Sequence, residues 1–410
     1  MTTRVLKLDR PLRLHPLTYL EEADEVTVGR ADTNSFGLFP ADGAALLRHM
    51  EAGHPPNEAA RWYSEQYGEQ VDISEFLDVL DDLGLIVNDG EATPEPVQIR
   101  WRRLGTAIFS LPAWVCYALL VGGAIMAMIR DPYLRPNYQH LFFIRSSLVI
   151  LVLGIVLGQV PWLLLHEAFH ALASRRLGLN STLRIGRRFY YIVFVTSLDG
   201  LVSVPRRKRY LPMLAGMLLD LIAIAGLTLT AAALHSATGT GAFVYRLLLS
   251  MAFGVVLRFA WQFYFFLRTD LYYLATTVFG CNDLQTTARQ LLHNRFWRLL
   301  RRRDRQVDES AWHPRDLSVA RWYSWLMIAG YAWLTGILIA TAFPVGIRLT
   351  ELAFHELTTT QSPLKMVDAL GFLVLNFWEP ALVAGLAIRA LRRTRRPGAA
   401  LTSVRESAAR

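Results

Sequence analysis

Six long apolar stretches beyond residue 100 constrain the fold of this chain more than any other feature. Each approaches or exceeds the roughly 20 residues that a helix needs to cross a bilayer. One such stretch could be a buried core helix, but six with charged loops between them predict a polytopic membrane protein. The predicted fold class is therefore mainly α, with about six transmembrane helices. The stretches run approximately Gly105–Ile129, Ser147–Leu172, Leu211–Leu234, Leu247–Leu267, Trp322–Val345 and Val367–Ile388.

The charges between these stretches predict how the chain crosses the membrane. Lys and Arg gather after the second, fourth and sixth stretches, and the other loops hold few of them. Because basic loops stay on the cytosolic side, we expect a multi-pass protein of the cell membrane with both termini in the cytosol. Met1–Leu20 has no apolar core region, so we expect no cleavable signal there. The alternation of basic loops with apolar stretches also accounts for the net charge of +9, so no nucleic-acid partner is needed to explain it.

Charge also divides the chain into regions. Residues 1–95 hold 7 Lys and Arg against 19 Asp and Glu, whereas residues 96–410 hold 36 against 15. We therefore predict an acidic cytosolic domain at 1–95, a six-span membrane domain at 96–391 and a basic cytosolic tail at 392–410. Asn88–Pro96 is the expected polar linker.

The acidic domain should be a small α+β unit. Asp72–Leu83 has apolar residues at i, i+3, i+4 and i+7, the pattern of an amphipathic helix. These residues are Phe76, Val79, Leu80 and Leu83. In the rest of the domain we expect strands in Tyr19–Phe39 with turns at Gly29 and Asn34. We also expect helices in Ala44–Met50 and Asn57–Tyr67 and a closing strand at Leu85–Val87.

A His-Glu-x-x-His motif ends the second apolar stretch. His166 and His170 are four residues apart, so they lie on one helix face and can bind one zinc ion. Glu167 follows the first of them and can act as the general base on a metal-activated water. Two His and a Glu in an apolar helix are costly in lipid unless they face a functional interior. This cost favours a zinc site over a chance motif.

A catalytic zinc site needs a third protein ligand, and three downstream acids are candidates. Asp270 is favoured because it ends the fourth stretch at a depth similar to that of His166, roughly 27–35 Å from the outer boundary at 1.5 Å per residue. Asp199 precedes Gly200 between two apolar runs, which is the pattern of a hairpin turn. Asp220 lies inside the third stretch, where it can hydrogen-bond to a metal ligand or approach the site. Asp199 and Asp220 remain alternatives.

Arg188–Val204 is predicted to form a small cytosolic β-hairpin that turns at Asp199 and Gly200. A protease must hold its substrate with an extended backbone, and a sheet edge beside the zinc could do so by strand addition. A plain connecting hairpin is the other interpretation. Two further charges, Arg258 and Glu379, fall inside apolar stretches, and we expect each to pair with the other or with Asp220.

The motif carries a family resemblance. His166–Leu172 reads HEAFHAL and is followed by Arg175, Arg176 and Gly178, which resembles the site-2 protease family of intramembrane zinc metallopeptidases. In that family the two motif histidines and a later aspartate bind zinc, and the motif glutamate is the base. The resemblance therefore implies the ligand set His166, His170 and Asp270, with Glu167 as the base.

The later motifs resemble a bacterial branch of this family that is associated with peptide maturation and export. Its second motif reads approximately RTDGYY, and Arg268–Tyr273 reads RTDLYY, with Leu271 in place of the glycine. The family has Ala-Gly-Pro in its third span, and Ala215–Met217 lacks the proline. The Leu-Asp-Gly triplet of the wider family occurs at Leu198–Gly200, which we interpret as unrelated to zinc binding.

The front domain resembles the PqqD-like winged-helix domains, which bind the leader peptides of ribosomally made, modified peptides. The similarity lies in His15-Pro16, the Gly53–Tyr67 region and the ending Leu83–Val87. It implies that this domain binds a leader peptide. The other interpretation is a small acidic domain that packs on the basic cytosolic loops as a cap.

Together these features predict an intramembrane zinc metalloendopeptidase that cuts a membrane-associated or leader-bearing peptide near the cytosolic face, in peptide maturation or export. Its partners would be one zinc ion, a peptide or membrane-protein substrate and the lipid bilayer. Two alternatives are regulated intramembrane proteolysis of a membrane-anchored regulator, and a non-catalytic peptide-binding or export subunit that keeps a vestigial motif. Cys116 and Cys281 lie in dissimilar contexts and predict neither a disulfide nor a thiolate zinc site.

Overall fold

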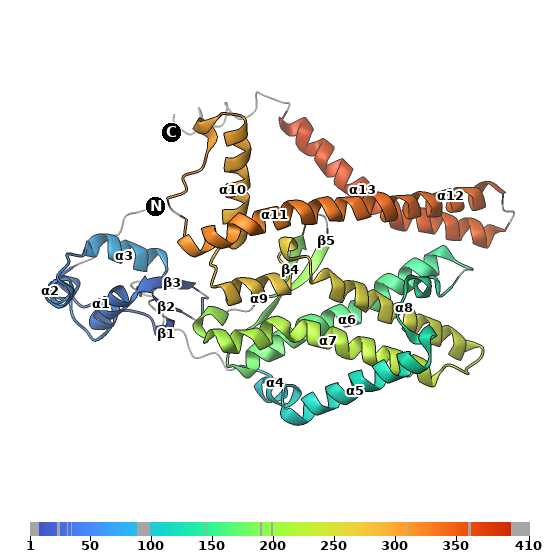
Figure 1. The fold of residues 1–410 in the computed structure, drawn as a ribbon, viewed down its shortest axis with the longest axis horizontal. Coiled ribbons are helices and arrows are strands. Elements are labelled where there is room, and N and C mark those ends of the chain that lie inside the picture. Colours follow the sequence, from blue (N-terminus) through green and yellow to red (C-terminus); the bar gives the residue numbers. More distant parts are fainter. Residues whose placement is uncertain are drawn as a thin grey trace, which may run out of the picture.

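The computed structural model describes most of the chain as a small domain beside a long helical body (Figure 1). The described residues are 8–22, 25–30, 32–33, 35–87, 99–144, 146–188, 191–197, 200–310, 312–359 and 362–394. The linker predicted at Asn88–Pro96, Asp199 and residues 395–410 of the predicted tail therefore lie outside the described residues. Glu379 falls in a described helix, but its side chain is outside the description.

The first domain is a three-stranded antiparallel sheet followed by three helices. The strands are β1 (Thr18–Glu22), β2 (Glu25–Arg30) and β3 (Ser35–Pro40), in that order, and the helices are α1 (Ala41–Glu51), α2 (Pro56–Tyr67) and α3 (Ile73–Asp82). The strands and helices expected between residues 19 and 83 are confirmed, but the turn expected at Gly29 is wrong, since Gly29 lies inside β2 and pairs with Thr18 and Phe36. Asn34, the other expected turn, lies outside the described residues. The closing strand is a single bridge between Leu14 and Ile86. The winged-helix assignment stays a prediction.

Helix α3 begins where the sequence indicates but buries a different face. The Asp72 side chain accepts hydrogen bonds from the backbone N–H groups of Ser74 and Glu75, which caps the helix. Leu77 and Leu80 are buried in the domain core, while Val79 is 45% exposed. The prediction that Val79 belongs to the core face is therefore wrong. Leu77 takes the place of Val79 in the core, because the side of the helix that faces the core is centred on Leu77 and Leu80.

Five helical stretches in the described part of the chain are long and apolar enough to cross a membrane. They are α5 (Leu111–Arg130), α6 (Leu148–Arg176), α7 (Arg206–Ala233), α8 (Thr240–Trp261) and the continuous stretch Pro314–Thr359. That last stretch comprises α11 (Pro314–Ile337), a π-helical turn at Leu338–Ala342 and α12 (Phe343–Thr359). The first predicted span is shorter than expected, because a separate helix, α4 (Arg102–Ile108), precedes α5.

The predicted sixth span falls within α13 (Pro363–Thr394), which packs against α12 and α6. Its Asp368 carboxylate binds the start of α6: it accepts hydrogen bonds from the Ser147 hydroxyl, from the backbone N of Leu148 at 2.8 Å and from that of Val149 at 3.2 Å. An anionic group at a helix N-terminus is stabilising. This contact fixes the far end of the helix that carries the His-Glu-x-x-His motif.

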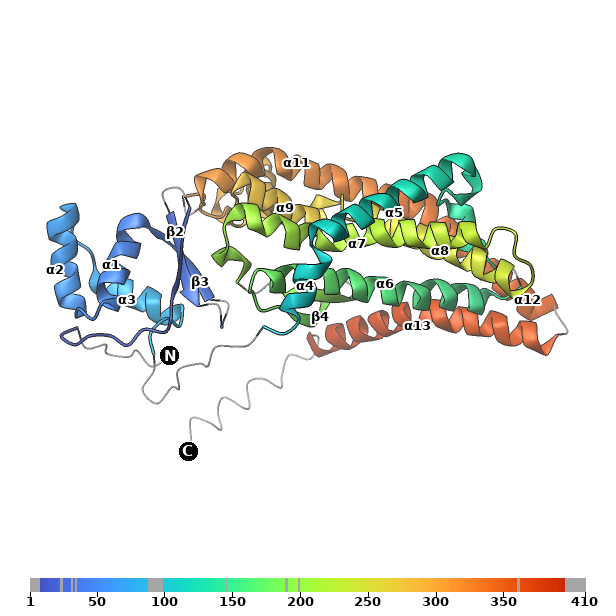
Figure 2. The same ribbon diagram turned by 90° about the horizontal axis from the view of Figure 1, so that it is seen from below.

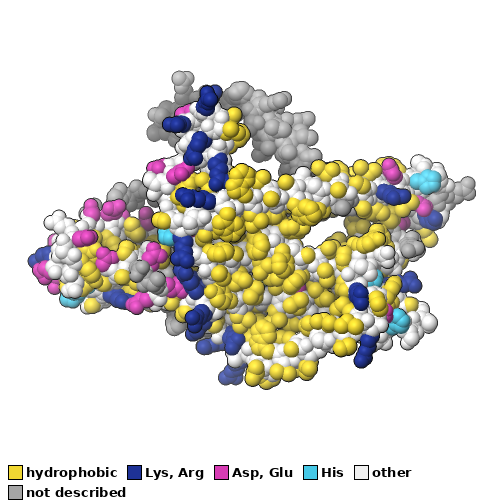
Figure 3. Space-filling view, viewed as in Figure 1, with side chains coloured by type: hydrophobic (Ala, Val, Ile, Leu, Met, Phe, Trp, Pro, Cys, Tyr) yellow, Lys and Arg dark blue, Asp and Glu magenta, His cyan; other side chains and the backbone are white. Residues whose placement is uncertain are grey.

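Apolar side chains cover the outer surface of the helical body (Figure 3). Few residues of the apolar windows of α5 and α6 are buried, so their hydrophobic side chains face outward as they would toward lipid. In the same view, Lys and Arg side chains form a column where the body meets the first domain. The chain is therefore a membrane protein by fold, and the orientation of its termini stays a prediction.

The fourth span and the hairpin differ from what the sequence predicted. Helix α8 ends at Trp261, and after a short 3₁₀ turn at Phe265–Leu267 (η4) a new helix, α9 (Asp270–Phe279), begins. The hairpin consists of β4 (Thr182–Arg188) and β5 (Tyr191–Ser197), with Arg188 opposite Tyr191. The predicted turn at Asp199 and Gly200 is wrong, since Leu201–Ser203 is a 3₁₀ turn (η3). The sequence analysis missed the first strand because arginines interrupt the alternation of apolar and polar residues in Thr182–Arg188.

The remaining short elements lie between these spans. Two 3₁₀ turns, η1 (Pro132–Leu134) and η2 (Tyr138–Phe142), connect α5 to α6. Helix α10 (Leu284–Leu299) and the 3₁₀ turn Arg303–Arg305 (η5) connect α9 to α11. In Figure 1 α10 runs across the direction of α11. Helix α7 packs against α5, α6, α8 and α9, so it forms the centre of the body and contacts every helix that positions the motif.

Candidate metal centre

Helix α6 places the two motif histidines side by side in the interior. His166 and His170 are one helical turn apart, and their side chains are almost entirely buried. Their Nε2 atoms lie 3.2 Å from each other. Glu167, the next residue along the helix, is half-buried and lines the adjoining cavity.

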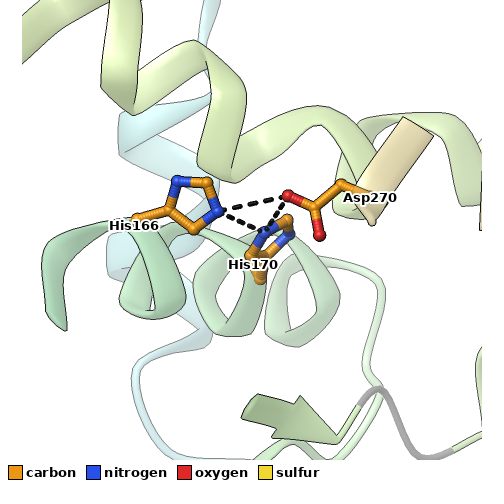
Figure 4. Close-up of side chains that lie close together, drawn as sticks. All are labelled: His166, His170 and Asp270. Carbon is orange, nitrogen blue, oxygen red and sulfur yellow. Dashed lines mark hydrogen bonds and ion pairs between the residues drawn. The ribbon is translucent and has the colours of Figure 1, made fainter. Parts of the chain in front are cut away.

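Asp270 reaches these histidines from the turn that follows α8 (Figure 4). Its Oδ2 atom lies 3.2 Å from Nε2 of His166 and 3.1 Å from Nε2 of His170. The turn is held by Gln262, whose carbonyl accepts a hydrogen bond from Thr269 and whose side-chain oxygen accepts one from the backbone N of Asp270. Arg268 adopts a left-handed conformation (φ +55°), which redirects the chain into α9. Asp270 thus begins a helix rather than ending the fourth span.

The outward-facing nitrogens of both imidazoles already have acceptors. Nδ1 of His170 lies 2.7 Å from the carbonyl oxygen of Pro212, and Nδ1 of His166 lies 3.1 Å from Oδ1 of Asp220. A carbonyl or a carboxylate accepts hydrogen bonds, so each Nδ1 is the donor and each neutral ring turns a lone pair on Nε2 inward. With Oδ2 of Asp270, three electron-pair donors converge on one point. Such a cluster is suited to a cation.

The spacing of these three atoms fits zinc. Zn–N and Zn–O bonds of about 2.0–2.1 Å at tetrahedral angles put ligand atoms roughly 3.3 Å apart. The three separations at this site are 3.1, 3.2 and 3.2 Å. The donor set of two imidazoles and one carboxylate also matches catalytic zinc sites, which leave the fourth position open. The residues present therefore fit a zinc ion.

Asp220 lies behind His166 and does not join the three converging atoms. It is fully buried in α7, and its Oδ1 atom also accepts a hydrogen bond from Nε of Arg258 at 3.1 Å. The expectation that Arg258 pairs with Asp220 is confirmed. Because a carboxylate behind a ligand histidine fixes the ring and increases its basicity, Asp220 is placed to support His166. Asp199, the other alternative ligand, lies outside the described residues.

Gly216 of α7 is a site residue that the sequence analysis did not single out for this role. A Cβ atom there would lie 2.3 Å from Nε2 of His170 and 2.4 Å from Nε2 of His166. Only a glycine lets α7 pack this closely on the imidazoles. The signal in the sequence is a glycine in the middle of an apolar helix, which usually has a packing or functional reason.

A cavity of about 640 Å³ opens beside the three converging atoms. Its wall includes Glu167 and Asp270, and also Arg206 and Arg209 from the first turns of α7. The other lining residues are Leu163, His166, His170, Leu201, Val202, Met213, Arg258, Trp261, Gln262, Tyr273, Thr276, Thr277, Gly280, Cys281 and Asn282. The cavity is large enough for several residues of a peptide.

No family model, curated protein or solved structure matches this chain. The function of the chain is therefore inferred from the geometry of the site.

Proposed function

We propose that this chain is an intramembrane zinc metalloendopeptidase that cuts a peptide near the cytosolic face of the cell membrane. The observation that carries the proposal is the convergence of His166, His170 and Asp270, whose ligand atoms lie 3.1–3.2 Å apart beside a cavity that Glu167 also lines. A metal site with an open position next to a carboxylate is the arrangement of metal-dependent hydrolysis. The apolar surface of the surrounding helices supports a site inside the membrane.

Each residue of the site would have a separate role in peptide hydrolysis. His166, His170 and Asp270 would hold one zinc ion, which supplies a Lewis acid that acidifies water and polarises a peptide carbonyl. Glu167 would take a proton from the attacking water and return it to the leaving amine. Asp220 and the Pro212 carbonyl keep the two imidazoles in the tautomer that binds metal. The site-2 protease resemblance assigns the same roles.

The first domain would bind the substrate's leader segment. An apolar groove of about 340 Å³ lies between β3 and α3, lined by residues such as Gly37, Phe39, Phe76 and Leu83. An extended peptide could pair with the edge strand β3 and place side chains in this groove. The substrate would then be a short leader-bearing peptide, and the reaction would belong to peptide maturation or export. In this proposal both termini are cytosolic.

Metal analysis combined with cleavage assays tests the proposal. Purified full-length protein should contain one zinc per chain, and a small precursor peptide encoded next to its gene should be cut. Glu167→Gln should keep the zinc and lose at least about 10²-fold in activity, because only the general base is removed. Glu356→Gln is the matched control, since Glu356 of α12 pairs with Lys365 of α13 and neither residue lines the cavity. Absence of zinc, or normal cleavage by Glu167→Gln, would refute a zinc protease.

The same assays separate the two alternative functions. A regulatory protease would cut a membrane-anchored regulator and ignore the precursor peptide. A non-catalytic subunit would bind the peptide with equal affinity before and after Glu167→Gln and would cut neither substrate. The His-His-Asp geometry with an adjacent Glu167 favours an active enzyme over this second alternative.

A further inference from the structure

The first domain contacts the helical body at residues that line the metal cavity. Strands β1 and β2 lie against the 3₁₀ turn η3, and Figure 2 shows the sheet facing the end of the body. Leu201 and Val202 of η3 line the cavity. The domain is therefore docked on part of the cavity wall.

One carboxylate of the first domain binds two arginines that line the cavity. Oε1 of Glu22 accepts a hydrogen bond from the backbone N of Arg206 at 3.0 Å and lies 3.1 Å from Nη2 of Arg209. Oε2 of Glu22 accepts a hydrogen bond from Nε of Arg206 at 3.0 Å. The Glu22 side chain is 18% exposed and that of Arg209 is 11% exposed. Both oxygens of the carboxylate are thus held by charged donors, which is how proteins recognise this group.

Both arginines also belong to the cavity wall. Arg209 is fixed by hydrogen bonds from its guanidinium to the carbonyls of Val204 and Val202. The guanidinium of Arg206 approaches Gly280, where a Cβ would lie 2.9 Å from its Nη1. The charge of Arg209 is therefore held in place by the helical body, independently of Glu22.

We propose that Arg206 and Arg209 form a carboxylate-binding subsite of the metal cavity, and that Glu22 fills it until an acidic group of the substrate replaces it. This inference rests on the proposed peptidase function for its substrate. Glu22 then acts as an internal competitor that holds the first domain against the cavity wall. A substrate peptide with an Asp or Glu displaces Glu22, releases this contact and binds the same arginines.

Helix α7 gives the distance between this subsite and the metal centre. Arg209 and Arg206 precede Gly216, which touches both imidazoles, by seven and ten residues. At 1.5 Å per residue they lie about 10–15 Å from the imidazoles along the helix. An extended peptide covers this distance in about three to five residues at roughly 3.3 Å each. The acidic residue of the substrate should lie that far from the bond that is cut.

Cys281 provides a test that needs neither substrate nor metal. It lines the same cavity beside Gly280, and the chain's other cysteine, Cys116, is removed by Cys116→Ser. In full-length protein in detergent, Cys281 is modified with two thiosulfonate reagents. One carries an anionic sulfonate group, and the other carries a cationic trimethylammonium group in its place. The ratio of the two rates cancels any change in the thiol pKa and reports the anion preference of the cavity.

Glu22→Gln should raise this ratio about threefold to tenfold, since the arginines become available to the anionic reagent. Adding Arg206→Gln and Arg209→Gln should return the ratio to its original value. Glu21→Gln is the matched control, because Glu21 pairs with Arg48 inside the first domain and its substitution removes the same charge. An unchanged ratio in Glu22→Gln, or an equal rise in Glu21→Gln, overturns the subsite. Either result leaves the zinc and Glu167 assays unaffected.

Discussion

Nδ1 of His166 lies 3.1 Å from Oδ1 of Asp220, and the same carboxylate binds Arg258, so a buried chain of three residues leads from α8 to the metal centre. Breaking a buried charge pair by removing one partner is costly, because the other charge stays buried and unpaired. The positive charge of Arg258 therefore stabilises the buried Asp220 carboxylate in the interior of the helical body.

Asp220→Asn should weaken metal binding by about 10–100-fold without abolishing it. Asn keeps an oxygen that can accept the hydrogen bond from His166, and only the negative charge is lost. The measurement is the zinc dissociation constant by chelator competition on the folded fraction. Asp316→Asn is the control, since Asp316 is buried and accepts two backbone hydrogen bonds at the start of α10, on another helix pair. Equal loss of zinc in both variants would contradict a specific role for Asp220.

Gly216→Ala should remove zinc from the protein, because the added methyl group would overlap both Nε2 atoms. The matched control lies in the same helix: a Cβ at Gly226 meets nothing within 4 Å. Gly226→Ala should keep zinc and stabilise α7 by up to about 1 kcal/mol through helix propensity. Metal content and thermal unfolding of the two variants decide the matter. Full zinc occupancy in Gly216→Ala would show that α7 does not pack on the ligands.

Asp270→Ala should lower the zinc content to a small fraction, since one of three protein ligands is lost. Asp199→Ala should leave it unchanged, because His166, His170 and Asp270 already supply the three protein ligands of a catalytic zinc site. The comparison uses metal analysis of both variants at equal protein concentration. Normal zinc in Asp270→Ala together with loss in Asp199→Ala would make Asp199 the third ligand.

The features that could be predicted from the sequence are those encoded within a single segment of the chain, and contacts between segments could not be predicted in the same way. The spacing of His166 and His170 follows from helix geometry, and the membrane spans follow from hydropathy, so both could be predicted. The approach of Asp270 was favoured by depth, although the argument assumed an unbroken fourth span and the structure has a turn at Arg268. The contact of Gly216 with the imidazoles depends on how α7 packs on α6. Packing of this kind has no periodic signature.

The pairing of Glu22 with Arg206 could not be predicted for a related reason. The charge split of the chain indicates that an acidic domain and basic loops share one compartment, but it does not choose among many carboxylates. The choice is made by the shape of the sheet, which brings the end of β1 to η3. Similarly, the first strand of the hairpin was missed because Arg184, Arg187 and Arg188 interrupt its alternating pattern.

A substrate scan tests the position of the acidic residue once a cleaved peptide is known. A glutamate moved along otherwise constant peptides should give the highest kcat/KM about three to five residues from the cut bond, about threefold to tenfold above the glutamine analogue. The Arg209→Gln variant should lose this preference, mainly through a higher KM for the glutamate peptide. Glu22→Gln should lower the KM for the glutamate peptide, because the internal competitor is gone. A preference that survives Arg209→Gln would place the acidic subsite elsewhere in the cavity.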